Sequence, residues 1–183
     1  IHFAEYTVLM QRKKTIYILV VALLIGVGLR WLAMVAEDGM SHDESISYLA
    51  ASGNWGAYQE AVEGAEPYGS WVPASTWKAF LDPRPSLPFG SISADLARLD
   101  VRPPLYFWLL HVGMLVFGLH NWTGTAVNLL LFIPSTIALY FLARRLLKNE
   151  QEAAFVCLIW AASPALIDVT TEARQYELLG LAI

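Results

Sequence analysis

Residues 15–36 read TIYILVVALLIGVGLRWLAMVA, and this apolar stretch decides the class of fold. It matches the ~20 apolar residues that a helix needs to cross the hydrocarbon core of a bilayer. Arg12, Lys13 and Lys14 precede it, as basic residues precede a signal peptide. However, its apolar core exceeds the usual ~7 to 15 residues and no small-residue cleavage pattern follows, so the sequence predicts a retained transmembrane helix.

Composition extends this conclusion to the whole chain. Hydrophobic residues make up 56% of the 183 residues and charged residues 15%, whereas a soluble domain carries about 25% charged residues. The sequence therefore predicts an all-α integral membrane protein. Lys and Arg occur in short clusters at the ends of apolar runs, which argues against nucleic acid as a partner. The single cysteine, Cys157, cannot form an internal disulfide, so it does not indicate a redox compartment.

Apolar runs and polar insertions divide the chain into predicted segments. These are a cytoplasmic N-terminal tail (1–14), a first transmembrane helix (15–36), an extracytoplasmic loop (37–102), an interfacial or re-entrant helix (103–119), two transmembrane helices (124–147 and 152–170), and an outer loop with the start of a further helix (171–183). Met10 is the expected natural start, which would make residues 1–9 non-native. We expect a longer protein, of which this piece alone is inactive.

The charged flanks predict how these segments cross the membrane. Two basic clusters, at 12–14 and 144–148, are both expected in the cytoplasm by the positive-inside rule. With the loop 37–102 outside, an odd number of crossings must separate it from the second cluster, and residues 124–147 supply one. Residues 103–119 should therefore lie along the outer surface or dip into it. The alternative is that they cross and that the second basic cluster lies outside.

Within the loop, residues 45–61 and 92–99 are predicted to form short helices. Ser91 or Ser93 is the expected N-cap of the second helix.

Aromatic and charged residues near the membrane each have two interpretations. Residues 67–88 are rich in Pro, Trp and Tyr, which favours an irregular surface. Trp71 and Trp77 either anchor this surface at the membrane interface or contact a sugar or an acceptor. Arg30, the only charge in the first helix, either extends to the headgroups or binds a lipid phosphate.

Three charged clusters meet on the outer side if this topology holds. A charge at the centre of a membrane costs about 2.5 to 3.5 kcal/mol on insertion scales, so their convergence indicates pairing or function. The clusters are Asp43 with Glu44, Asp100 with Arg102, and Glu172 with Arg174.

The first cluster contains a candidate general base. Asp43 and Glu44 are adjacent, so only one of them should face a substrate. A carboxylate within ~3 Å of an attacking hydroxyl can accept its proton. The alternative is structural: Ser41 or Asp43 caps a helix that begins near residue 45, and the helix dipole favours the acids.

The second cluster contains a candidate phosphate ligand. Arg102 precedes two prolines, of which Pro103 or Pro104 should occupy the first position of the next helix. A guanidinium beside a helix N-terminus suits a phosphate. The alternative is an interfacial arginine bonded to a headgroup or to Asp100.

The third cluster lies near a helix start. Glu172 and Tyr176 are spaced i, i+4 and should share a helix face, while Arg174 should point elsewhere. The alternative is an ordinary polar loop.

Five motifs in order along the chain carry a family resemblance. They are Asp43-Glu44, DVRPPLY at 100–106, RRL at 144–146, Ser163-Pro164 and EARQY at 172–176. Together with the apolar helices, they resemble the N-terminal part of the GT-C glycosyltransferases, in particular the protein mannosyltransferase and aminoarabinose transferase branch (glycosyltransferase family 39 type). The resemblance implies a bundle of transmembrane helices with a large extracytoplasmic first loop that contains short interfacial helices.

The resemblance also implies residue roles. Asp43 matches the acid taken as catalytic base, with Glu44 its usual neighbour, although His42 replaces a residue that is often aromatic or apolar. Arg102 matches a position beside the lipid phosphate, more often His or Lys, and Asp100 matches an acid that precedes it. The polar cluster near the active site is matched by Glu172, Arg174 and Tyr176. Some relatives bind a divalent metal, but the sequence offers no convincing ligand spacing, and we predict no metal site.

The implied activity is inverting transfer of a hexosyl or pentosyl group from a polyprenyl-phosphate-linked sugar. The acceptor would be a protein, lipid or glycan, at the outer face of the plasma (inner) membrane, with membrane lipid as the surrounding partner. Two other classes stay open: a transporter or flippase for a lipid-linked or anionic substrate, and a noncatalytic membrane subunit. Neither the sugar nor the oligomeric state follows from the sequence.

Overall fold

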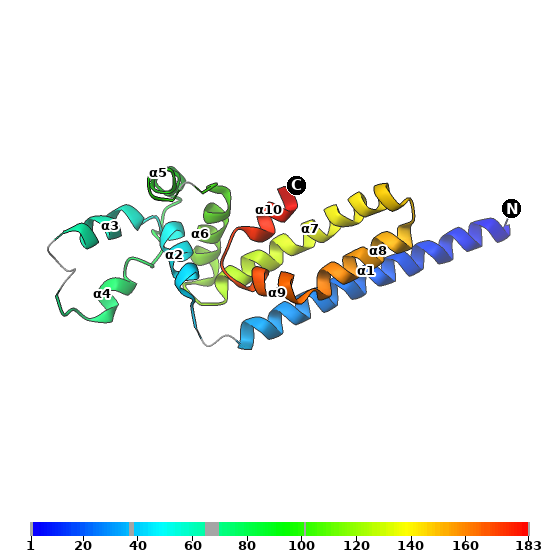
Figure 1. Ribbon diagram of the computed structural model, residues 1–183, viewed down its shortest axis with the longest axis horizontal. Helices are drawn as coiled ribbons and strands as arrows, with labels where there is room; N and C mark the ends of the chain where they lie inside the picture. The colour runs from blue at the N-terminus through cyan, green and yellow to red at the C-terminus, as the bar shows by residue number, and fades with distance from the viewer. Residues whose placement is uncertain (1, 37–38, 65–69, 101, 183) are drawn as a thin grey trace. The chain divides into compact units, whose positions relative to one another are not determined.

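The computed structural model describes residues 2–36, 39–64, 70–100 and 102–182, and the regular structure in these ranges is helical (Figure 1). This confirms the predicted all-α class. The helices are α1 (His2–Ala36), α2 (His42–Ser52), α3 (Trp55–Glu63), α4 (Ala74–Lys78), α5 (Phe89–Leu99), α6 (Leu105–Phe117), α7 (Thr123–Leu147), α8 (Glu150–Ala162), α9 (Pro164–Thr171) and α10 (Tyr176–Ala182).

The chain divides into two compact units. Unit 1 comprises Ile1–Asp38, Asn128–Thr171 and Tyr176–Ile183, and unit 2 comprises Gly39–Val127 and Glu172–Gln175. Helix α7 therefore contributes its first turn to unit 2 and its remainder to unit 1. The short segment 172–175 belongs to unit 2, although the residues on either side of it in sequence belong to unit 1.

Two helices in the described ranges are long and apolar enough to cross a membrane: Leu9–Ala36 of α1 and the whole of α7. Helices α8 and α9 make a third span if the pair, bent by 58° at its break, is counted as one. The apolar helix α6 has 13 residues, which is about 20 Å and too short for a hydrocarbon core of about 30 Å. These lengths agree with a short interfacial or re-entrant helix between the first two spans.

The segment boundaries differ from the prediction at both ends of unit 1. Helix α1 already begins at His2, so the predicted tail 1–14 is largely helical, because its basic residues are good helix formers and no Pro or Gly interrupts it. The predicted helix 152–170 is broken at Pro164, which lacks a backbone N–H and holds Ser163 in an extended conformation.

The loop helices differ as well. The predicted helix 45–61 is two helices, because Gly53 adopts a left-handed conformation (φ 80°) and ends α2. Helix α5 begins at Phe89, three residues earlier than predicted. Ser91 and Ser93 do not cap it; their hydroxyls donate back to the carbonyl oxygens of Pro88 (3.0 Å) and Phe89 (2.7 Å). Helix α4 interrupts the irregular stretch 67–88, whose first residues, 67–69, lie outside the described ranges.

Small side chains let α1 and α8 pack closely in unit 1, where Figure 1 shows them side by side. Ala22, Phe132, Cys157 and Ala161 form a fully buried cluster. A Cβ on Gly26 would overlap the Phe132 ring. Close approach through small residues is the usual way in which membrane helices associate.

Arg30 stabilises the break between α8 and α9. Its side chain is fully buried, so the expectation that it extends to the headgroups is wrong. It donates hydrogen bonds to Thr170 Oγ1 (2.7 Å) and to the carbonyl oxygens of Ala161 (3.2 Å) and Gly26 (3.1 Å). Its guanidinium carbon also lies 4.1 Å from the centre of the Phe132 ring. The break at Pro164 leaves the last carbonyl oxygens of α8 without helical N–H donors. The buried guanidinium of Arg30 supplies a donor in their place.

Replacing Arg30 by methionine should lower the free energy of unfolding by about 2 kcal/mol, because Ala161 and Thr170 lose a charged donor in an apolar environment. Thermal unfolding in detergent measures this. The stability of Arg30→Lys should lie between that of the parent and that of the methionine variant. Leu32→Met, at an exposed neighbouring position, should leave the stability unchanged. A methionine variant as stable as the parent would show that Arg30 does not hold the break.

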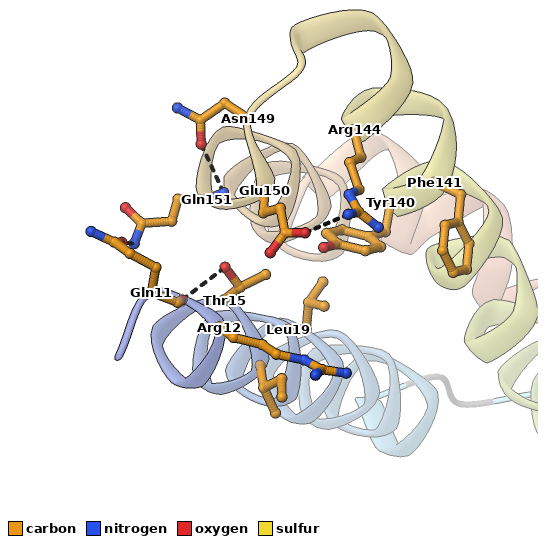
Figure 2. Close-up of a pocket in the computed structure, with 11 residues that line it drawn as sticks. Gln11, Arg12, Thr15, Leu19, Tyr140, Phe141, Arg144, Asn149, Glu150 and Gln151 are labelled. Atoms are coloured by element: carbon orange, nitrogen blue, oxygen red, sulfur yellow. Dashed lines mark hydrogen bonds and ion pairs between the residues drawn. The ribbon is translucent and has the colours of Figure 1, made fainter. Parts of the chain in front are cut away.

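The two basic clusters lie at the same end of unit 1. Arg12 and Arg144 line one cavity, and the side-chain amides of Gln11 and Gln151 are in contact (Figure 2). This is the arrangement that the predicted topology requires. The assignment of this end to the cytoplasm stays a prediction.

Helix α2 is the centre of unit 2, where it contacts α3, α5 and α6. The buried residues Tyr48, Ile92, Leu96 and Leu110 form part of its core. His111 is also fully buried, and its ring nitrogens lie 2.7 Å from Ala51 O and 2.9 Å from Ser86 O. This histidine therefore ties α6 to α2 and to the loop that precedes α5.

Candidate active site

The start of α2 is fixed by a capping box, a reciprocal pair of hydrogen bonds. Ser41 is the N-cap, and Glu44 N–H donates to its hydroxyl (3.2 Å) while Ser41 N–H donates to Glu44 Oε2 (2.8 Å). The capping interpretation therefore holds for Ser41, and the helix begins at His42 rather than near residue 45. Asp43 and Glu44 both lie in the first turn, where the helix dipole favours negative charge.

Glu44 is a buried structural link. Only 2% of the residue is exposed, and its second carboxylate oxygen, Oε1, accepts a hydrogen bond from Ala173 N–H (3.0 Å). Both oxygens are therefore engaged by backbone donors, one at the start of α2 and one in the segment 172–175. The geometry gives Glu44 a positioning role, and its predicted catalytic role stays untested.

Asp43 is the accessible carboxylate of the pair. Its side chain is 57% exposed and forms an ion pair with Arg174. The Arg174 guanidinium also pairs with Glu172, with Nε 3.1 Å from Oε2. The structure thus brings Asp43 together with Glu172 and Arg174, which lie far from it in sequence, and both carboxylates pair with the Arg174 guanidinium. Arg174, at 20% exposure, offsets the charge of both carboxylates and restrains the position of Asp43.

The predicted helix face shared by Glu172 and Tyr176 is wrong. Helix α9 ends at Thr171 and α10 begins at Tyr176, so residues 172–175 form a tight turn in which Arg174 N–H donates to Glu172 O (2.7 Å). The Thr171 hydroxyl bonds back to Asp168 O (3.0 Å) at the end of α9, which favours termination there. Glu172 and Arg174 belong to unit 2 and Tyr176 to unit 1.

Gly124 sets how closely this turn approaches α7. A Cβ at Gly124 would overlap the Ala173 side chain and lie 2.7 Å from its Cα. The Gly124 N–H donates to the Tyr48 hydroxyl (2.6 Å), which donates in turn to His120 O (2.9 Å). No local pattern in the sequence predicts these contacts of Gly124, Ala173 and Tyr48, because the residues lie far apart along the chain.

Arg102 pairs with Asp100, with Nε 2.8 Å from Oδ2 and both side chains partly exposed. This agrees with the alternative in which the arginine is bonded to its neighbouring acid. Pro104 is the N-cap of α6 rather than its first residue, and the helix begins at Leu105. Among the described contacts, Arg102 pairs with Asp100 and Asp43 pairs with Arg174, so the expected meeting of the Asp100–Arg102 cluster with the other two stays a prediction.

A cavity of about 470 Å³ lies against the neighbouring face of α2. His42, Ser45 and Leu49 of α2 line it, together with Tyr58 of α3 and Trp77 of α4. The centres of the two aromatic rings are 6.1 Å apart, and the rings meet edge to face. Trp77 thus faces a cavity, as a ligand-contacting residue would, whereas Trp71 is fully exposed.

The described residues contain no group of three or more His, Cys, Asp or Glu side chains that could hold a metal ion.

Residues 101–182 match the protein family described as dolichyl-phosphate-mannose-protein mannosyltransferase. The match supports a membrane glycosyltransferase of the GT-C type. It confirms the resemblance over a segment that contains Arg102, α6 to α9 and the turn 172–175, whereas Asp43 and Glu44 lie outside it. Searches of curated proteins and of solved structures found no match. The family and the apolar helices together support a membrane location.

Proposed function

We propose that this chain transfers a sugar from a polyprenyl-phosphate-linked donor to an acceptor at the extracytoplasmic face, with Asp43 as the general base. The observation that carries the proposal is the Asp43–Arg174–Glu172 cluster. It joins an exposed carboxylate to the turn 172–175, which lies inside the segment that matches a glycosyltransferase family. A base restrained by a third group is the usual arrangement for activating a nucleophile.

The transfer inverts the anomeric carbon. An acceptor hydroxyl attacks that carbon from the face opposite the phosphate, the bond between the carbon and the phosphate oxygen breaks, and the electron pair leaves with the lipid phosphate. Asp43 takes the hydroxyl proton. Arg102 offsets the charge on the departing phosphate. The lipid part of the donor stays in the bilayer throughout.

The cavity beside His42 is a suitable binding site for the acceptor or the sugar. It shares helix α2 with Asp43, and it combines aromatic walls with a few polar groups, Ser45 and Lys78 among them. This composition is typical of sites for small organic ligands.

A direct test supplies the full-length protein, in lipid vesicles, with a polyprenyl phosphate carrying a radiolabelled sugar. A glycosyltransferase releases the label from the lipid and yields free polyprenyl phosphate. A transporter or flippase moves the intact lipid-linked sugar between leaflets without release, and a noncatalytic subunit does neither. Movement without release would overturn the proposal.

Replacing Arg102 by alanine should weaken donor binding by roughly tenfold or more, because a charged hydrogen bond to phosphate contributes about 1.5 to 3 kcal/mol. The dissociation constant of the polyprenyl-phosphate sugar measures this. Arg102→Lys should retain most of the affinity, since an ammonium also binds phosphate.

Arg98, an exposed arginine in the last turn of α5, provides the matched control. Arg98→Ala should leave donor affinity unchanged. If Arg102→Ala binds the donor as tightly as the parent, Arg102 does not contact the lipid phosphate.

The location in the plasma (inner) membrane is part of the same proposal. It rests on the basic clusters at one end of unit 1, which the positive-inside rule assigns to the cytoplasm.

A further inference from the structure

A cavity lies at the basic end of unit 1, and the proposed transfer reaction does not use it. It measures about 900 Å³ and is enclosed by the start of α1, the end of α7 and the start of α8 (Figure 2). We propose that this cavity binds the headgroup phosphate of an anionic membrane lipid.

Two guanidinium groups line the cavity from different helices. Arg12 comes from α1 and Arg144 from α7. Arg12 is exposed and makes no hydrogen bond or ion pair with any part of the chain that the structure describes. An exposed arginine that lines a cavity and bonds to no described residue is available for a phosphate, whose oxygens suit the planar guanidinium.

Glu150 is the one carboxylate among the described residues that line the cavity, and it is paired with a cation. Glu150 Oε1 lies 2.5 Å from Arg144 Nη2, and Figure 2 shows the two side chains facing each other. Arg144 retains further N–H donors beyond this pair. With Arg12, Arg144 and Glu150 taken together, the lining carries one net positive charge, and Lys13 and Lys14 line an adjoining cavity.

The turn between α7 and α8 holds these groups in place. Lys148 adopts a left-handed conformation (φ 55°), and its N–H donates to Arg144 O (3.0 Å). Asn149 caps α8 by accepting a hydrogen bond from Gln151 N–H (2.9 Å). Because the Gln151 and Gln11 side chains are in contact, the turn is also joined to α1. The cavity is therefore built from three restrained elements rather than from free side chains.

The apolar walls favour a lipid over a free anion. Ile16, Leu19 and Phe141 line the cavity on the side that continues along the spans, and the first and last of these are more than half exposed. Tyr140, whose ring combines an apolar face with a hydroxyl, is of the type found at membrane interfaces. A lipid can place its phosphate between the arginines and its acyl chains along these residues, whereas inorganic phosphate gains nothing from them.

The test uses the full chain purified in detergent and native mass spectrometry with dioleoyl phosphatidylglycerol, and with dioleoyl phosphatidylcholine as the zwitterionic counterpart. We expect preferential retention of phosphatidylglycerol. Arg12→Gln should weaken that binding about fivefold, the factor that corresponds to the ~1 kcal/mol of one basic side chain near an anionic surface. Since Arg12 bonds to no described residue, this variant keeps the fold intact, and Arg144→Gln extends the test to the second arginine.

Arg145→Gln is the matched control, because Arg145 belongs to the same basic cluster and is exposed but does not line the cavity. It should leave the affinity unchanged. Equal loss in Arg12→Gln and Arg145→Gln would show diffuse surface attraction and overturn the site. Equal retention of the two lipids, or complete displacement of the lipid by millimolar inorganic phosphate, would overturn it as well.

Discussion

Replacing Asp43 by asparagine is expected to lower the turnover of sugar transfer by about 10² to 10⁴-fold, the contribution of a positioned general base. Asparagine keeps the size of the side chain and its place in the first turn of α2, but its amide cannot take the proton of the attacking hydroxyl. Donor affinity should change little, because the proposed phosphate ligand is Arg102. The measurement is turnover at saturating polyprenyl-phosphate sugar, with donor binding determined separately.

Glu44 and Glu60 serve as comparisons for this variant. Glu60→Gln, at an exposed position in α3, should leave turnover unchanged. Glu44→Gln should lower the melting temperature, since Glu44 accepts hydrogen bonds from Ser41 and Ala173. It should nevertheless keep the acid limb of the pH–rate profile, which Asp43→Asn should abolish. If the acid limb disappears in Glu44→Gln and persists in Asp43→Asn, the base has been assigned to the wrong carboxylate.

The features that sequence reasoning identified correctly are those set by neighbouring residues. The length of an apolar run determines whether a helix can span a membrane, so α1 and α7 were predictable. Ser41 was likewise one of two candidate caps, and the capping box it forms is local, because Ser41 and Glu44 have the spacing of a serine followed three residues later by a glutamate. The left-handed Gly53 that ends α2 carried a recognisable signal, a glycine after a helical stretch, which the prediction of one continuous helix overlooked.

Contacts between distant residues were not predictable in the same way. Arg30 was expected either to extend to the headgroups or to bind a lipid phosphate, but its position depends on the carbonyl oxygen of Ala161, 131 residues further along the chain. Similarly, Glu44 bonds to a backbone N–H 129 residues away. A single sequence indicates that such polar groups need partners, but it does not indicate which partner the fold brings near.

Replacing Gly124 by alanine should lower turnover by roughly 10²-fold, although the residue carries no chemistry. The added methyl group would overlap Ala173 and approach its Cα to 2.7 Å, so backbone must move rather than a flexible side chain. The turn 172–175 would then shift, weakening the hydrogen bond from Ala173 to Glu44 and displacing Arg174 from Asp43. A misplacement of about 1 Å at a catalytic group is enough for a 10²-fold loss. Overpacking should also cost about 1 to 3 kcal/mol of stability.

Gly90 offers a closely matched control, because it is likewise the second residue of a helix and a Cβ there meets no atom within 4 Å. Helix propensity alone predicts that either substitution stabilises its helix by up to ~1 kcal/mol, so Gly90→Ala should show this gain with unchanged turnover. The double variant Gly124→Ala/Ala173→Gly should recover part of the lost activity, since it removes one of the two overlapping methyl groups. Parent-like turnover and melting temperature in Gly124→Ala would mean that the turn does not depend on this contact to position Arg174 beside Asp43.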